Sequence, residues 1–182
     1  MKTLKTKRLI LRLWKKSDLD DFFEYASVPG VGEMAGWPHH EDKEVSKAIL
    51  QSFIDNGDVY AIVLKENKKV IGSLGVHDRA IDSDFKADNQ RMIGFALSKA
   101  YWGQGLIPEA VQEVTNYAFE KLRVNILWCS HFVENLQSQR VIQKCGFTFY
   151  GKGVYEAKLL DKSFDEIKYI MTKNDYRALM EK

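Results

Sequence analysis

The chain has 182 residues, of which 45% are hydrophobic and 29% are charged, and its formal net charge is +2. This length and balance are typical of a globular protein, so we expect residues 1–182 to form a single domain. The near-neutral charge argues against a dedicated nucleic-acid-binding protein, which usually carries a strong basic excess. No stretch approaches the roughly 18 consecutive apolar residues of a membrane span, so we expect no membrane partner.

The cysteines and histidines suggest neither a disulfide framework nor a metal site. Cys129 and Cys145 are the only cysteines, which is too few for a disulfide scaffold. Neither they nor the four histidines show paired metal-ligand spacing. Met1–Leu13 alternates basic and apolar residues and lacks the continuous apolar stretch of a signal peptide. We therefore expect a reduced, cytoplasmic protein without a bound metal.

The first half of the chain predicts three strands and two helices. Thr6–Trp14 alternates as a strand does. Ser17, with Asp20 three positions later, has the pattern of a capping box and predicts a helix start. The remaining predicted elements are a loop over Pro29–Pro38, a helix over Glu41–Ile54 that stops at Asn56-Gly57, and strands over Val59–Leu64 and Val70–His77.

The second half predicts a β-α-β unit followed by a hairpin. A polar loop over Asp78–Gln90 precedes a strand over Arg91–Ser98, a helix over Gln104–Leu122, a strand over Asn125–Phe132 and a short helix over Ser138–Cys145. Strands over Phe147–Leu160 and Phe164–Met171 flank the turn Asp161-Lys162-Ser163, and Thr172 with Asp175 marks a terminal helix. This order predicts a mixed α/β domain whose β-α-β crossover is right-handed.

A Gly-x-Gly turn, Gly103-Gln104-Gly105, joins the predicted strand directly to the long helix. Glycines let backbone N–H groups converge on an anion, and a helix N-terminus favours negative charge there. An ordinary tight turn explains such a pattern equally well. A P-loop would continue with Lys and Ser or Thr instead of Leu106-Ile107, and a dinucleotide-binding turn would carry glycine or alanine at Pro108.

Three segments share their pattern with one protein family. Ala100, Gly103 and Gly105 hold the first, fourth and sixth places of Q/R-x-x-G-x-G/A, with Ala100 departing from the usual Gln or Arg. Asn135–Phe147 fits N-x-x-S-x-x-V/L-x-x-K-x-G-F, and Thr6–Trp14 fits T-x-R-L-x-L-R. Together they resemble the GNAT superfamily of N-acetyltransferases, in the branch of ribosomal-protein alanine/serine N-terminal acetyltransferases, over nearly the whole chain.

The resemblance implies a fold and a co-substrate. The GNAT fold has a mixed, mostly antiparallel sheet of about seven strands, splayed between strands four and five, with helices on both faces. The pantetheine arm of acetyl-CoA would lie in the splay, where the amide N–H of Ala96 or Leu97 would stabilise the oxyanion. The implied acetyl-CoA-binding residues are Phe95, Ala96, Leu97, Gly103, Gln104, Gly105, Leu106, Ile107, Asn135, Ser138, Arg140 and Lys144.

The residues after the fifth strand have both functional and structural interpretations. Asn135 would bind pantetheine or brace the splay, or it caps the next helix. Ser138 would stabilise the departing CoA thiolate, because a serine hydroxyl is a poor acid, or it too is a capping residue. Arg140 and Lys144 lie four apart on one helical face, which suits phosphates but also describes solvated surface charge.

The acceptor side is less defined, because Met92 stands where some relatives place a glutamate base. His77 is our choice of base, since histidine changes charge near neutral pH. Asp78, Glu156, His39, Glu41 and a water chain are the alternatives. The lack of an obvious carboxylate base favours an α-amine or a weakly basic small amine over lysine. We expect Trp37, His39 and Glu156 to contact the acceptor, with Gly36–His40 over its pocket.

Two functions from different classes follow. The first is an N-acetyltransferase that moves acetyl directly from acetyl-CoA to a primary amine, either a protein N-terminal α-amine or a small molecule, in a ternary complex. Cys129 and Cys145 have no histidine partner in the pattern, so we expect no acetyl-cysteine intermediate. The second is a non-catalytic acyl-CoA-binding module, which Met92 supports and Asn135 and Ser138 oppose. A homodimer is a further expectation, because dimers are common in the branch.

Overall fold

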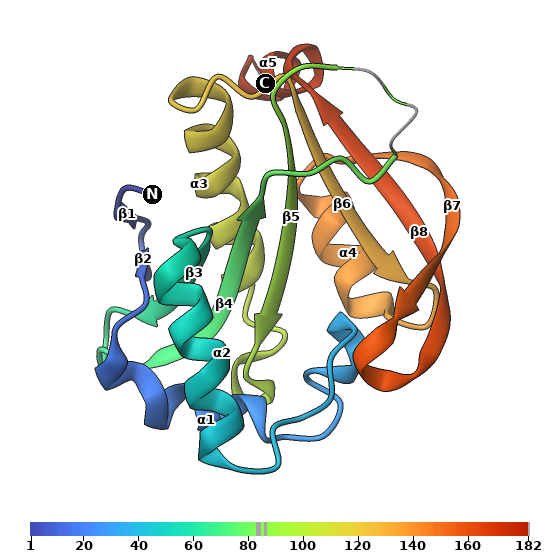
Figure 1. Cartoon of the computed structure of the whole chain (residues 1–182). Coiled ribbons are helices and arrows are strands. Elements are labelled where there is room, and N and C mark those ends of the chain that lie inside the picture. The colour runs from blue at the N-terminus through green and yellow to red at the C-terminus, as the bar shows by residue number, and fades with distance from the viewer. Residues whose placement is uncertain (83–84, 86, 182) are drawn as a thin grey trace.

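The computed structural model describes residues 1–82, 85 and 87–181 (Figure 1). In this part of the chain, eight strands form one sheet in the order β1-β2-β3-β4-β5-β6-β8-β7. The strands are β1 (Leu4–Lys5), β2 (Leu9–Leu13), β3 (Val59–Leu64), β4 (Val70–His77), β5 (Gln90–Leu97), β6 (Ile126–Phe132), β7 (Thr148–Ala157) and β8 (Lys162–Thr172). The α-helices are α1 (Leu19–Ala26), α2 (Lys43–Asn56), α3 (Leu106–Glu120), α4 (Leu136–Lys144) and α5 (Lys173–Met180). No helix of the described chain is long and apolar enough to cross a membrane.

The sheet divides at the pair formed by β5 and β6. All other neighbouring strands pair antiparallel, whereas β5 and β6 are parallel and joined through α3. Their register covers only Gln90–Met92 against Ile126–Trp128. Beyond these residues the two strands diverge, as Figure 1 shows towards the bottom of the view. The predicted splay and the mostly antiparallel sheet are confirmed. Because the short strand β1 was not predicted, the predicted fourth and fifth strands correspond to β5 and β6.

Helices cover both faces of the sheet, as predicted (Figure 1). On one face, α1 and α2 pack over β2–β4 around a cluster that contains Trp14, Phe22 and Leu50. On the other face, α3 supplies the largest share of the core, because its apolar residues recur at helical spacing. Its buried residues include Ala110, Val111, Val114, Ala118 and Phe119. The two helical layers thus bury both faces of the sheet.

Helix ends test the predicted capping residues. The capping box of Thr172 and Asp175 is confirmed, because Asp175 accepts the Thr172 N–H at 2.8 Å and returns its own N–H to Thr172. The box predicted for Ser17 and Asp20 is wrong. Asp18 instead accepts the Lys15 N–H at 2.8 Å and binds the Arg12 guanidinium at 2.7 and 2.8 Å, so that α1 begins only after it.

Two predicted segments remain to be placed. The predicted stop at Asn56-Gly57 is confirmed, since Gly57 ends α2 in the left-handed region with φ 62°. The predicted loop over Asp78–Gln90 lies partly outside the described residues.

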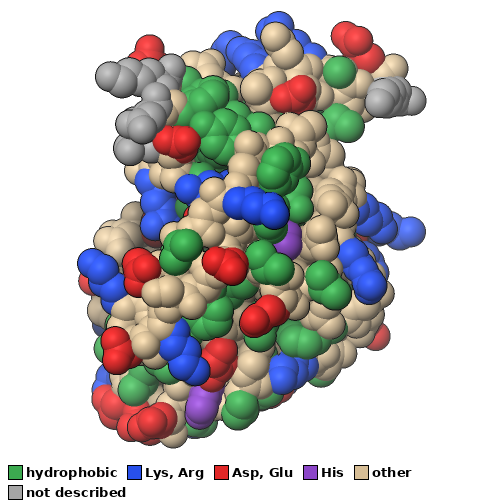
Figure 2. Space-filling model, turned by 90° about the vertical axis from the view of Figure 1, so that its right-hand side faces the viewer, with side chains coloured by type: hydrophobic (Ala, Val, Ile, Leu, Met, Phe, Trp, Pro, Cys, Tyr) green, Lys and Arg blue, Asp and Glu red, His purple; other side chains and the backbone are tan. Residues whose placement is uncertain are grey.

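The strand β7 forms an edge of the described sheet, since it pairs with β8 alone. Phe149 and Val154 on this strand are exposed. Figure 2 views this side of the molecule and shows hydrophobic side chains gathered among charged ones. Unpaired edges with exposed apolar residues suit pairing with another chain. The homodimer stays a prediction.

Candidate active site

The turn from β5 into α3 presents a row of unpartnered backbone donors. Gly103 and Gly105 adopt left-handed φ values of 75° and 72°, which favour glycine. A Cβ on Gly103 would point into open space, with nothing within 4 Å. In the described chain, five successive N–H groups donate to no acceptor, those of Gly103, Gln104, Gly105, Leu106 and Ile107. Because they lie at the N-terminus of a 15-residue helix, they form a cradle for an anion.

A cavity of about 320 Å³, here called the cofactor cavity, adjoins this cradle. It extends between the end of β5, the start of α3 and one face of α4. Of the twelve residues predicted to bind acetyl-CoA, its lining contains Phe95, Ala96, Leu97, Gly103, Gly105, Leu106, Ile107, Asn135, Ser138, Arg140 and Lys144. Gln104 alone lies outside this lining, and its carbonyl accepts the Arg8 guanidinium at 2.9 Å. The sequence prediction thus places its residues around one cavity.

The divergence of the strands exposes one backbone edge of β5. The Ser98 N–H donates to Ile71 of β4 at 2.8 Å. Because N–H groups alternate in direction along an antiparallel strand, those of Leu97 and Phe95 face away from β4, into the splay. The indole of Trp102 donates to the Leu97 carbonyl at 2.8 Å, which agrees with that direction. The geometry therefore favours Leu97 over Ala96 as an N–H donor inside the gap.

The start of α4 faces the same gap. The Asn135 side chain caps this helix, because its oxygen accepts the Ser138 N–H at 3.0 Å. Its amide nitrogen donates to the Met34 carbonyl at 3.2 Å, which ties α4 to the loop after α1. Asn135 thus has the capping role that was weighed for it and also links two walls of the site. The Ser138 hydroxyl has no hydrogen-bond partner among the described residues, which leaves it available to a ligand.

A second cavity of about 270 Å³, here called the acceptor cavity, adjoins the first. The two linings share the β5 edge, Ser138 and the loop residues Met34 and Ala35. Two of the residues predicted on the acceptor side, Trp37 and His77, line this second cavity.

His39 and Glu156 lie in neither described lining. The His39 ring instead contacts Glu33 at 2.7 Å, and Glu156 accepts the Ser163 hydroxyl at 2.8 Å.

His77 is held by a carboxylate that the sequence did not identify. Its Nδ1 lies 2.7 Å from Asp58 Oδ2. An ionised carboxylate only accepts, so Nδ1 donates this hydrogen bond, and in the neutral ring Nε2 is then the nitrogen with the lone pair. The ring folds back over Gly75, where a Cβ would lie 2.2 Å from Nε2. Met92 stands directly opposite His77 in the register of β4 and β5. The pair of Asp58 and His77 therefore presents Nε2, which has no hydrogen-bond partner among the described residues, beside the acceptor cavity.

The loop that carries Met34 and Ala35 is fixed by one carboxylate. Glu33 accepts the Gly30 N–H at 2.6 Å, the His39 N–H at 3.2 Å and the His39 ring at 2.7 Å. Burial alone would raise the pKa of Glu33, but the bonds from His39 and Gly30 outweigh it and lower the pKa to about 2. The glycines of this loop were visible in the sequence, whereas its contact with both cavities depends on the fold.

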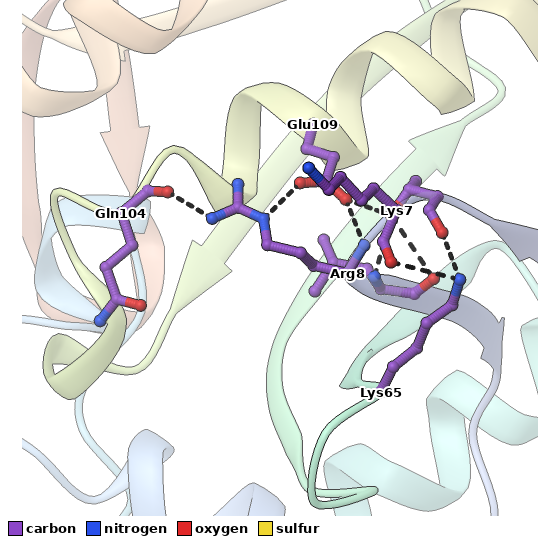
Figure 3. A network of polar contacts seen from close by, with 7 residues as sticks. Lys7, Arg8, Lys65, Gln104 and Glu109 are labelled. Carbon is purple, nitrogen blue, oxygen red and sulfur yellow. Dashed lines mark hydrogen bonds and ion pairs between the residues drawn. The ribbon is translucent and has the colours of Figure 1, made fainter.

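A network on the N-terminal side braces the cradle (Figure 3). Glu109, in the first turn of α3, accepts the Thr6 hydroxyl at 2.5 Å and the Arg8 N–H and Nε at 2.7 Å each. Arg8 also donates to the Gln104 carbonyl, and Lys65 binds the Thr6 carbonyl. Burial would raise the pKa of Glu109, but its bonds to Thr6 and Arg8 lower it overall. The start of β2 is thereby tied to the cradle and to α3.

Both cysteine thiols are unsuited to carry an acetyl group. Burial raises the pKa of Cys129 and of Cys145 to about 12 each. A thiol with so high a pKa supplies almost no thiolate at neutral pH. In the described part of the chain, no three His, Cys, Asp or Glu side chains are grouped as metal ligands would be.

Comparison with known proteins identifies the class. A family model described as an acetyltransferase (GNAT) domain matches residues 8–148. The chain therefore belongs to the GNAT acetyltransferases, and it is an acetyl-CoA-dependent N-acetyltransferase. It is 27% identical over 181 residues to the uncharacterized N-acetyltransferase p20 of Bacillus licheniformis, an alignment that covers 97% of this chain and 99% of the relative.

Solved structures confirm the fold. A GNAT-family acetyltransferase from Bacillus anthracis superposes with a TM-score of 0.83 at 19% identity, over 95% of this chain and 99% of the other. The ribosomal-protein-S5-alanine acetyltransferase from Vibrio fischeri superposes with a TM-score of 0.74 at 18% identity, over 96% and 98%. The branch that the motifs indicated is thus represented among the structural neighbours. At these identities the likeness establishes the fold and leaves the acceptor open.

Proposed function

We propose that the enzyme transfers acetyl directly from acetyl-CoA to a primary amine while both substrates are bound. The observation that carries this proposal is the meeting of two cavities at the splay. The cofactor cavity contains the anion cradle, the acceptor cavity contains His77, and Ser138 and the β5 edge line both. A thioester and an amine that enter from the two sides would meet there, which supplies the proximity that a direct transfer needs.

The cofactor cavity fits acetyl-CoA in charge and in backbone chemistry. The five free N–H groups of the cradle suit the pyrophosphate, and Arg140 and Lys144 on α4 suit the remaining phosphate charge. Both side chains are exposed, so they would attract the phosphates without a large desolvation cost. The exposed edge of β5 would pair with the pantetheine amides, as a neighbouring strand would. The thioester brings the activated acetyl group into the splay.

The residues at the splay can serve each step of the transfer. The amine lone pair attacks the thioester carbonyl carbon, a C–N bond forms, and the carbonyl oxygen becomes an oxyanion that the Leu97 N–H stabilises. The C–S bond then breaks, and the electron pair leaves with the CoA sulfur. The Ser138 hydroxyl, free of other partners, donates a hydrogen bond to that thiolate. The amine proton passes to His77 Nε2, directly or through water.

Asp58 gives His77 the orientation that a base requires. With Nδ1–H bound to the carboxylate, the protonated ring formed during transfer is stabilised by the adjacent negative charge. The buried cysteines support the same direct route, because neither thiol is ionised near neutral pH. We therefore propose His77 as general base, Asp58 as the residue that positions it, and Ser138 as the group that stabilises the thiolate.

The test is free-thiol release from acetyl-CoA over a panel of amines, with the acetylated product identified by mass. We expect release only when an amine is present. Ser138→Ala should lower kcat roughly ten- to a hundredfold, which corresponds to one hydrogen bond to a charged group. Ser52→Ala, an exposed serine on α2, is the matched control. Release without an amine, or an unchanged kcat in Ser138→Ala, would contradict the proposal.

A further inference from the structure

The acceptor cavity has a composition that the proposed transfer does not by itself explain. Its lining includes five aromatic side chains, those of Trp37, Phe53, Phe95, Phe132 and Tyr155. Its described lining contains no Asp or Glu. Basic residues are present, however, since His77 and Arg79 both line it. A site for a polyamine or an aminoglycoside would need carboxylates to bind the additional positive charges.

Three carboxylates that contact or adjoin lining residues already have partners. Asp58 holds His77, and Glu33 is bound by the loop N–H groups and by His39. Asp78, beside Arg79 in the sequence, binds the Arg91 guanidinium at 2.6 Å. A second cationic group on an acceptor would therefore meet no free carboxylate in the described part of this cavity.

Arg79, by contrast, has no charged partner among residues 1–82, 85 and 87–181. It is exposed, and its guanidinium forms no ion pair or hydrogen bond with the described residues. Its backbone N–H donates to the His77 carbonyl at 2.9 Å, which fixes it close to the proposed base. Guanidinium groups match carboxylates with two parallel hydrogen bonds, so a lone arginine beside an apolar cavity is suited to an anionic group.

We infer that the acceptor is a small primary amine that bears both a carboxylate and an apolar side chain, as an aromatic or aliphatic α-amino acid does, and that Arg79 binds the carboxylate. The inference rests on the proposed function and specifies its substrate class. The aromatic walls receive the apolar side chain, and the amine lies between His77 and the splay. A cavity of about 270 Å³ is at the small end for ligand sites, which suits a compact molecule.

The experiment compares matched amines at saturating acetyl-CoA. Phenylalanine, phenylalaninamide and spermidine are assayed with the wild-type enzyme and with Arg79→Gln. We expect the ratio of kcat/KM for phenylalanine over phenylalaninamide to fall about tenfold in Arg79→Gln, with the KM for acetyl-CoA unchanged. Because the ratio is compared between variants, the different basicity of the two amines cancels. Arg177→Gln, an exposed arginine on α5, should leave the ratio at its wild-type value.

Two readouts separate this inference from the proposed transfer. An unchanged ratio in Arg79→Gln, or a wild-type preference for spermidine, would overturn the inference and leave the transferase intact. If no amine releases thiol, the proposed transfer fails, and titration of phenylalanine into the CoA-loaded enzyme then decides the inference. Binding that is lost in Arg79→Gln would support it, and absence of binding would overturn it.

Discussion

Glu109→Gln tests whether the network in Figure 3 supports the cradle. The substitution keeps the size of the side chain and removes the charge that accepts three hydrogen bonds from Thr6 and Arg8. Bonds to charged groups are worth about 1.5–3 kcal/mol when buried. The Arg8 side chain is 42% exposed, so solvent screens its ion pair to about 0.2–1 kcal/mol. We expect a net loss of about 1–2 kcal/mol, or a Tm roughly 2–8 °C lower.

The same substitution should weaken cofactor binding. Arg8 also holds the Gln104 carbonyl, so a loosened Arg8 no longer fixes the turn that presents the free N–H groups. We expect the KM for acetyl-CoA to rise roughly three- to tenfold, with kcat within about twofold of wild type. Glu113→Gln, one turn further along α3, is the control. A variant Glu109→Gln with wild-type Tm and KM would refute the proposed bracing role.

The pH dependence of stability gives a second readout. The pKa of Glu109 is lowered in the folded protein from its ordinary value of 4.5. A carboxylate of this kind contributes stability above its unfolded pKa, and that contribution disappears as the pH falls through the lower folded pKa. The gap in Tm between wild type and Glu109→Gln should therefore be full near neutral pH and should close progressively below about pH 4.5. A gap that stays constant down to pH 3 would show that the charge is not its source.

Three further predictions address the cradle, the thiols and the base. Gly103→Glu should abolish acetyl-CoA binding measured by calorimetry, because its carboxylate would repel the phosphates. Gly103→Ala is the control for the backbone strain at φ 75°, which costs about 1–2 kcal/mol. Normal binding by Gly103→Glu would show that the phosphates bind elsewhere. Replacing Cys129 and Cys145 together by alanine should leave kcat within about threefold of the wild-type value. Mass spectrometry of the wild-type enzyme mixed with acetyl-CoA should find no acetylated protein, and an acetyl-cysteine adduct would contradict direct transfer. Asp58→Asn should lower kcat at neutral pH on the order of tenfold. In a His77→Ala background the same substitution should lower kcat little further. If the free-energy losses of the two substitutions add fully, the two residues act independently.

Local patterns in the sequence predicted the elements that line the cofactor cavity. The strand, the Gly-x-Gly turn and the helix that form the cradle are consecutive, so one segment of the sequence contains the whole cradle. The start of α4 is equally local, because Asn135 caps it through Ser138, three residues away. The helix start near Ser17 shows the limit of such patterns. Several acidic side chains there could act as caps, and the Arg12 guanidinium from β2 determines that Asp18 is the one used.

The acceptor side depends on contacts between distant segments, which no local pattern records. Asp58 and His77, which are in contact, lie 19 residues apart in the sequence, and Asn135 and Met34 lie 101 residues apart. The contrast between Arg79 and the paired carboxylates around the acceptor cavity likewise becomes visible only when the fold brings these elements together. The sequence indicated His77 by its chemistry alone, whereas the structure reveals the carboxylate of Asp58 that contacts its ring.

A crystal structure of the enzyme with acetyl-CoA tests the central claim most directly, namely that transfer occurs where the two cavities meet. We expect the pyrophosphate to accept hydrogen bonds from the N–H groups that begin at Gly103. The thioester oxygen should face the Leu97 N–H, with the sulfur beside Ser138 and the acetyl group directed into the acceptor cavity. Acetyl-CoA bound away from the splay, or an acetyl group directed away from His77, would contradict the account.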